Sequence, residues 1–134
     1  MADSRVLHED EWGEILDRPD QDILEIRWYD STADLDGQEF NRFLAVFADF
    51  VLDKRRPRIL VDATAFKMDP ARMDLDWRNV NIIPKYNQAG VERFAFHVPA
   101  GMPAIGLPPV PEGPAAFPTA WFASRREAIA WLRG

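Results

Sequence analysis

The stretch DGQEFNRFLAVFADFVLDK, residues 36–54, and the run RILVD, residues 58–62, decide the fold class. Asp36 and Glu39 form a capping box at the start of the first stretch, and Pro57 follows its basic end. The second run is short, apolar and β-branched, as expected of a central strand buried on both faces. A helix over 36–54 that leads into such a strand indicates an α/β fold. The helix is predicted by large apolar residues at helical spacing, which are Phe40, Phe43, Leu44, Phe47, Phe50 and Val51.

Before this helix, the sequence predicts a β-hairpin. The segments Glu14 to Leu16 and Ile23 to Trp28 are rich in β-forming residues, and Asp17-Arg18-Pro19-Asp20 between them has the composition of a turn. Polar and apolar residues alternate in the second segment, which is typical of a half-buried strand. The side chains of Ile23, Glu25 and Arg27 should point to one face of this strand, and those of Leu24, Ile26 and Trp28 to the other.

After the central strand, a second helix is expected to begin at Asp69-Pro70, an N-cap followed by a proline in the first turn. Pro84 should kink or split this helix, and Gly90 should end it. Its predicted buried face carries Met73, Trp77 and Val80. The remaining predicted elements are a buried strand over 93–98, a strand over 119–123 and a helix over 125–132 whose capping box is Ser124 and Glu127.

These elements predict one α/β domain over residues 1–134, with a mixed β-sheet of four to five strands and about four helices. The composition is that of a globular protein, since 47% of the 134 residues are hydrophobic and charges of both signs occur. The absence of cysteine excludes disulfides and thiolate metal sites. No signal peptide or membrane-spanning run is recognisable, so we expect a cytoplasmic protein with no membrane span.

The net charge of −6 argues against nucleic acid as a partner. Positive charge is concentrated only in Lys54, Arg55, Arg56 and Arg58, and a basic helix end explains that run more simply.

No catalytic residue, metal ligand or cofactor site is predicted. Asp34-Leu35-Asp36-Gly37 resembles part of a calcium loop, but Phe43 stands where the bidentate glutamate is needed. No G-x-S-x-G, Walker or H-E-x-x-H motif occurs. One enzymatic alternative stays open, a small metal-assisted hydrolase that uses Asp62 or His97. Its further carboxylates would be Asp69, Asp74 and Asp76.

Residues 99–118 hold most of the eleven prolines and form a connection longer than an ordinary loop. Apolar side chains within it suggest that it packs on something. We therefore predict a homodimeric, non-enzymatic binding or regulatory domain that recognises a protein partner or a small apolar, lipid-like ligand beside this loop. The candidate surface consists of Trp77, Tyr86, Met102, Phe117 and Trp121.

From Asp22 onward the chain resembles the SpoIIAA-like branch of the STAS domains, whose fold is related to CRAL-TRIO lipid-binding domains. The likeness is carried by residues 58–62, by Trp77 with 81–87 and Gly90-Val91, by 94–96 and by 127–132. The resemblance implies a small sheet-and-helix fold. In anti-sigma-factor antagonists of that superfamily, a phosphorylatable serine follows an aspartate after the central strand. Asp69 matches that aspartate, but Pro70 stands in place of the serine, so the resemblance implies no phosphorylation switch here.

Overall fold

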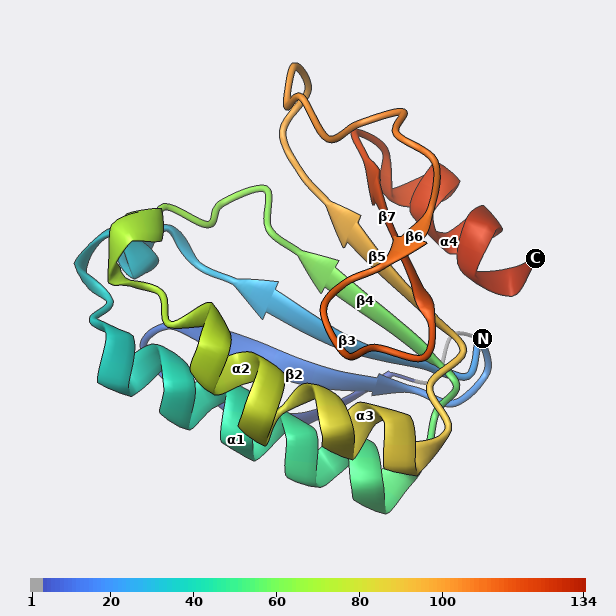
Figure 1. Cartoon of the computed structure of the whole chain (residues 1–134), viewed down its shortest axis with the longest axis horizontal. Helices are drawn as coiled ribbons and strands as arrows, with labels where there is room; N and C mark the ends of the chain where they lie inside the picture. The colour runs from blue at the N-terminus through green and yellow to red at the C-terminus, as the bar shows by residue number, and fades with distance from the viewer. Residues whose placement is uncertain (1–3) are drawn as a thin grey trace.

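The computed structural model describes residues 4–134 and shows an α/β fold built on one mixed sheet (Figure 1). Its strands are β1 (Arg5–Glu9), β2 (Gly13–Arg18), β3 (Ile23–Trp28), β4 (Arg58–Asp62), β5 (Arg93–His97), β6 (Val110–Pro111) and β7 (Pro118–Phe122). Its α-helices are α1 (Gly37–Lys54), α2 (Leu75–Asn81), α3 (Ile83–Ala89) and α4 (Arg125–Arg133). Two short 3-10 turns, η1 (Asp30–Asp34) and η2 (Pro70–Arg72), lie between them.

The described sheet has seven strands in the order β1-β2-β3-β4-β5-β7-β6, so the expectation of four to five strands was too low. Strands β3, β4, β5 and β7 are parallel, whereas the hairpin β1-β2-β3 and the short β6 are antiparallel to their neighbours. The two strands that the sequence did not reveal are the edges. β1 is mostly exposed and bulges near Val6, and β6 consists only of Val110 and Pro111, so neither carries a burial pattern.

Helix α1 begins and ends where its caps predict. The Glu39 backbone N–H donates to the Asp36 carboxylate at 2.8 Å, and Arg55 ends the helix in the left-handed conformation. The aromatic face of α1 packs on the sheet together with α3, and this layer holds the main core. Phe47 and Ala48 have no exposed surface at the centre of that layer.

The second helical region differs from its prediction at the start. Asp69 caps only the single turn η2, after which Met73 is extended, and α2 begins at Leu75 with Asp74 as its N-cap. Val80, expected on a buried face, is 73% exposed. Pro84 does divide the region into α2 and α3, and Gly90 ends α3 with a φ of 85°.

Helix α4 covers the opposite face of the sheet, where it lies mainly over β4, β5 and β7. The Glu127 backbone N–H donates to the Ser124 hydroxyl at 3.3 Å, which confirms the predicted cap. The core on this face is small and contains few large side chains. It consists of Ile23, Leu60, Ala95, Ala128 and Leu132.

The connection from β5 to β7 has two parts with different environments. Residues 99–109 project beyond the sheet (Figure 1) and are mostly exposed, which corrects the expectation of a packed loop. The second part is held against α3 by Asn87. Its amide donates to the Pro114 carbonyl at 3.0 Å and accepts from the Ala116 N–H at 2.8 Å. Ala115 and Phe117 are consequently buried.

Candidate functional site

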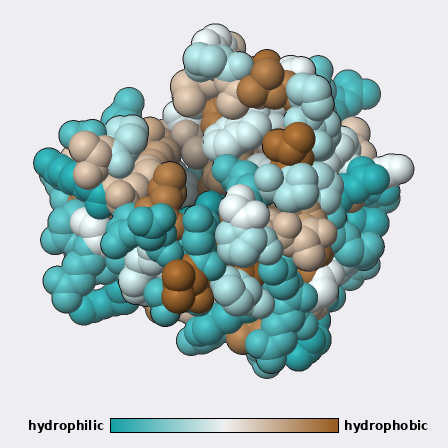
Figure 2. Space-filling model, in the orientation of Figure 1, coloured by the Kyte–Doolittle hydropathy of each residue, from teal (hydrophilic) through white to brown (hydrophobic). Residues whose placement is uncertain are grey.

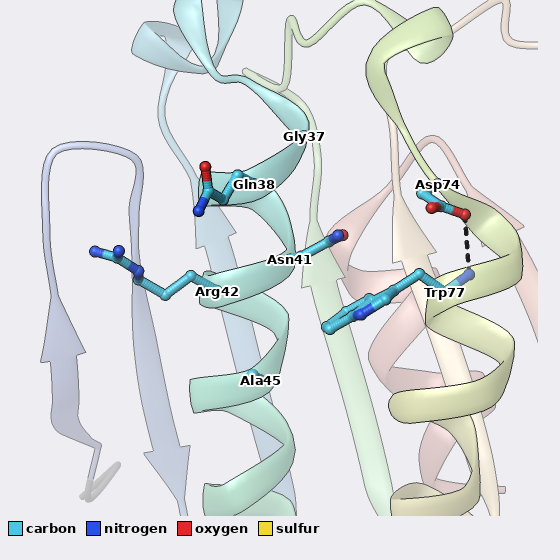
Figure 3. A pocket seen from close by; sticks show the side chains of 7 residues that line it. All are labelled: Gly37, Gln38, Asn41, Arg42, Ala45, Asp74 and Trp77. Carbon is cyan, nitrogen blue, oxygen red and sulfur yellow. Dashed lines mark hydrogen bonds between the residues drawn. The ribbon is translucent and has the colours of Figure 1, made fainter.

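A shallow groove of about 560 Å³ runs between the first half of α1 and the start of α2 (Figure 3). Its volume lies within the range of small-molecule sites, which is roughly 300 to 1,000 Å³. Helix α1 is anchored on the main core by its buried face, whereas α2 has no buried residue and meets that core only through the partly buried Trp77. The lining residues are Gly37, Gln38, Asn41, Arg42, Ala45, Asp74 and Trp77.

Trp77 is the aromatic wall of the groove. Its backbone N–H donates to the Asp74 carboxylate at 3.0 Å, and its carbonyl accepts from the Asn81 amide at 3.0 Å, so the first turn of α2 is held at both ends. From this position the indole reaches across toward α1 (Figure 3). The ring is partly buried against the core and partly exposed to the groove.

Asn41 faces Trp77 from α1 (Figure 3). Its Oδ1 is buried and accepts no hydrogen bond from any described residue. A buried polar atom without a partner lowers the stability of a folded protein by roughly 1–3 kcal/mol. A ligand that donates a hydrogen bond to this oxygen, after the side chain has turned toward it, would remove that cost. Arg42 extends to the other side of α1, where its guanidinium lies 3.6 Å from the Glu39 carboxylate.

The five residues of the predicted ligand or partner surface do not form one surface. Tyr86 and Phe117 belong to the core, with ring centroids 6.4 Å apart, and burial raises the pKa of the Tyr86 hydroxyl. Trp121 stacks on Phe96 at 4.1 Å, and Met102 is exposed on the projecting segment. Of the five, Trp77 alone lines the groove.

Of the residues of the hydrolase alternative, the structure brings Asp62 and His97 together. Asp62 and His97 lie at the ends of adjacent strands, with 3.9 Å between Asp62 Oδ1 and His97 Nδ1. Asp62 accepts hydrogen bonds from the Thr64 N–H and hydroxyl. Asp69 and Asp74 cap η2 and α2. No group of three metal-ligating side chains occurs within residues 4–134.

Sequence reasoning missed a buried charge network on the sheet face that carries α4. Glu25 in β3 has no exposed surface. Arg125 binds both of its carboxylate oxygens, at 2.7 and 2.9 Å, and Arg18 binds Oε1 at 2.7 Å. Arg27 approaches Oε2 at 3.5 Å. The alternation in β3 placed Glu25 on the polar face, but nothing local indicated that an arginine one hundred residues away would bury it.

The pKa of Glu25 reflects this environment. Burial alone would raise it, because an apolar surrounding disfavours the charged carboxylate. The hydrogen bonds and positive charges of Arg125 and Arg18 outweigh burial and lower the pKa below its ordinary value of 4.5. Glu25 is therefore an ionised structural anchor for the start of α4 at neutral pH.

Part of the basic run at the end of α1 is paired with acidic residues of the domain. Arg56 makes a two-pronged ion pair with Asp17, at 2.8 and 3.1 Å, and lies 3.4 Å from Asp22. Arg58 donates to the Gln21 carbonyl at 2.8 Å. These contacts agree with the structural interpretation of the run.

Comparisons with protein-family models, with curated proteins and with solved structures find no match. Within the described part of the chain, no helix has the length and apolar character that crossing a membrane requires.

Proposed function

We propose that this domain is a non-enzymatic binding module and that the groove between α1 and α2 takes a small planar organic molecule. One observation carries the proposal: a groove of ligand size combines the Trp77 ring with the unpaired amide oxygen of Asn41. Ligand sites in proteins typically pair an apolar or aromatic wall with a few polar groups that fix orientation. A planar molecule would stack on the indole and donate a hydrogen bond to the Asn41 amide oxygen once that side chain rotates into the groove.

The test is a fragment screen by two-dimensional amide NMR on the 134-residue chain. We expect planar fragments with an N–H donor to shift amide signals of the first half of α1 and of α2. Ala45→Leu places a larger side chain in the groove and should abolish these shifts. Ala130→Leu makes the same change at an exposed site on α4 and should leave them intact. Fragment shifts that survive Ala45→Leu, or that never reach the groove, would refute the proposal.

A protein partner is a second candidate, and the projecting segment 99–109 together with the adjoining edge strand β6 favours it. Met102, Leu107 and Val110 are 44, 59 and 56% exposed, although each is large and apolar. Figure 2 shows hydrophobic residues on this face of the molecule separated by hydrophilic ones, so the surface would suit a small contact. Replacing Leu107 and Val110 by serine should abolish such a contact and leave the fragment shifts of the groove unchanged.

The resemblance to SpoIIAA-like domains is part of the proposal. It is supported by the order of elements along the chain, in which parallel strands alternate with helices after an initial hairpin. Homodimer formation and residence in the cytoplasm are likewise proposals, and analytical ultracentrifugation of the purified chain would test the first.

A further inference from the structure

Three arginines converge at the amino ends of β4 and β5, on the face covered by α4. Arg58 and Arg93 are direct cross-strand partners in the parallel pairing of these strands. Arg133, in the last turn of α4, joins them around a small pocket of about 170 Å³. The complete lining is Arg58, Glu92, Arg93, Leu132, Arg133 and Gly134.

This arrangement is electrostatically unfavourable without a counter-charge. Like charges on directly opposed strand positions destabilise a sheet, and here a third guanidinium is added. The chain has 22 acidic and only 16 basic residues, so neutralising carboxylates are plentiful. Carboxylates do neutralise arginines elsewhere in the domain, where ion pairs are formed by Arg18, Arg27, Arg56, Arg78 and Arg125.

The three pocket arginines form no ion pair with any carboxylate among residues 4–134, and this includes Glu92 beside them. Two of them are nevertheless held in place. Arg58 donates to the Gln21 carbonyl, and Arg93 donates to the Trp131 carbonyl and lies over the Trp131 ring. Fixed guanidiniums with free N–H donors are the usual means of binding carboxylate and phosphate oxygens.

We propose that this pocket is an oxyanion site that binds one carboxylate or phosphate group of a small ligand. It lies at the opposite end of the strands from the carboxyl edge and is lined by none of the groove residues. The proposal therefore stands independently of the proposed function. The pocket volume suits a single oxyanion group, with any larger part of the ligand extending into solvent.

The test titrates the chain with inorganic phosphate and, separately, with acetate, at constant ionic strength, and follows amide NMR shifts. We expect saturable shifts at the starts of β4 and β5 and at the end of α4. The phosphate and acetate series show which oxyanion the pocket prefers. Arg133→Gln should weaken binding on the order of five- to tenfold, because it removes one charged donor while Arg58 and Arg93 keep their anchors.

Arg126→Gln is the matched control, since it removes the same charge from an exposed position of the same helix and does not line the pocket. It should leave the affinity unchanged. The proposal is overturned if neither anion gives saturable shifts at the pocket, or if the two variants weaken binding equally. An equal loss would mean that the anions respond to the net charge of α4 alone.

Discussion

Removal of the Glu25 carboxylate tests the role of the buried network most directly. Glu25→Gln keeps the size of the side chain but leaves Arg18 and Arg125, which are 16 and 32% exposed, without their anionic partner. Breaking a buried ion pair by removing one partner costs roughly 3–5 kcal/mol. Such a loss is a large part of the roughly 5–15 kcal/mol that stabilises a small domain.

The opposite truncation should cost less. Arg125→Met leaves Glu25 with the 2.7 Å bond from Arg18 and the longer contact from Arg27, so we expect a loss of about 1.5–3 kcal/mol. Urea unfolding followed by circular dichroism at pH 7 measures both variants. If Glu25→Gln does not fold, Arg125→Met and Arg125→Lys still report on the network, and the lysine variant should restore only part of the loss.

The pH dependence gives a second, independent check. Because the folded-state pKa of Glu25 is lowered, its contribution to stability is fully present above the ordinary value of 4.5 and is lost as the pH falls through the lower folded value. The stability difference between wild type and Glu25→Gln should therefore be constant from pH 7 to about 5 and shrink below pH 4. A Gln variant within about 1 kcal/mol of wild type at pH 7, or a difference that persists unchanged to pH 3, would refute the reasoning.

Three further changes test other parts of the fold. Asp36→Ala removes the N-cap of α1 and should lower the free energy of unfolding by about 1 kcal/mol in urea titrations, whereas Asp36→Asn should restore most of it. Phe47→Ala empties a site with no exposed surface and should cost about 3–5 kcal/mol in the same assay. Asn87→Ala frees the second part of the β5–β7 connection, so hydrogen exchange at the Ala116 amide should accelerate about fivefold or more while Gln88→Ala leaves it unchanged.

The sequence predicted elements well wherever local signals determine the outcome. Asp36, Ser124 and Gly90 mark helix ends through bonds or backbone angles within a few residues, and the structure has all three as expected. Asp69-Pro70 carries the same kind of signal but begins only one 3-10 turn. Local chemistry identified the cap correctly and could not determine where the turn would end, because Arg72 and Met73 make contacts with distant residues: Arg72 donates to the Leu35 carbonyl, and Met73 packs against the main core.

Features that depend on distant contacts were not predictable. Gln38, Asn41 and Ala45 read as the polar side of α1, and only the crossing of α2 makes them part of a groove with Trp77. Arg58 and Arg93 each stand at the start of a predicted strand, and only the parallel register of β4 and β5 places them side by side. In both cases the sequence shows the residue itself, but it does not show which distant residue lies beside it in the fold.

The different cover on the two sheet faces explains why so much charge is buried near Glu25. On one face α1 and α3 supply large aromatic side chains, and apolar side chains of β2, β3 and β4 that point to this face are packed against them. On the other face, α4 has only nine residues and lies mainly over β4, β5 and β7. Strands β2 and β3 must therefore cover much of this face with their own side chains.

Long arginine side chains meet that need, since their aliphatic stems shield the sheet while their guanidiniums remain near water. Arg18 and Arg27 extend over the β2–β3 surface, and Arg125 closes the cover from the first residue of α4. A carboxylate beneath three guanidiniums can accept from all of them, which a leucine at the same position could not do. A hydrophobic isostere could equal the network in stability. Such an isostere would not determine where α4 begins to pack on the sheet. We infer that the role of Glu25 is to fix this position through its directional hydrogen bonds to Arg125.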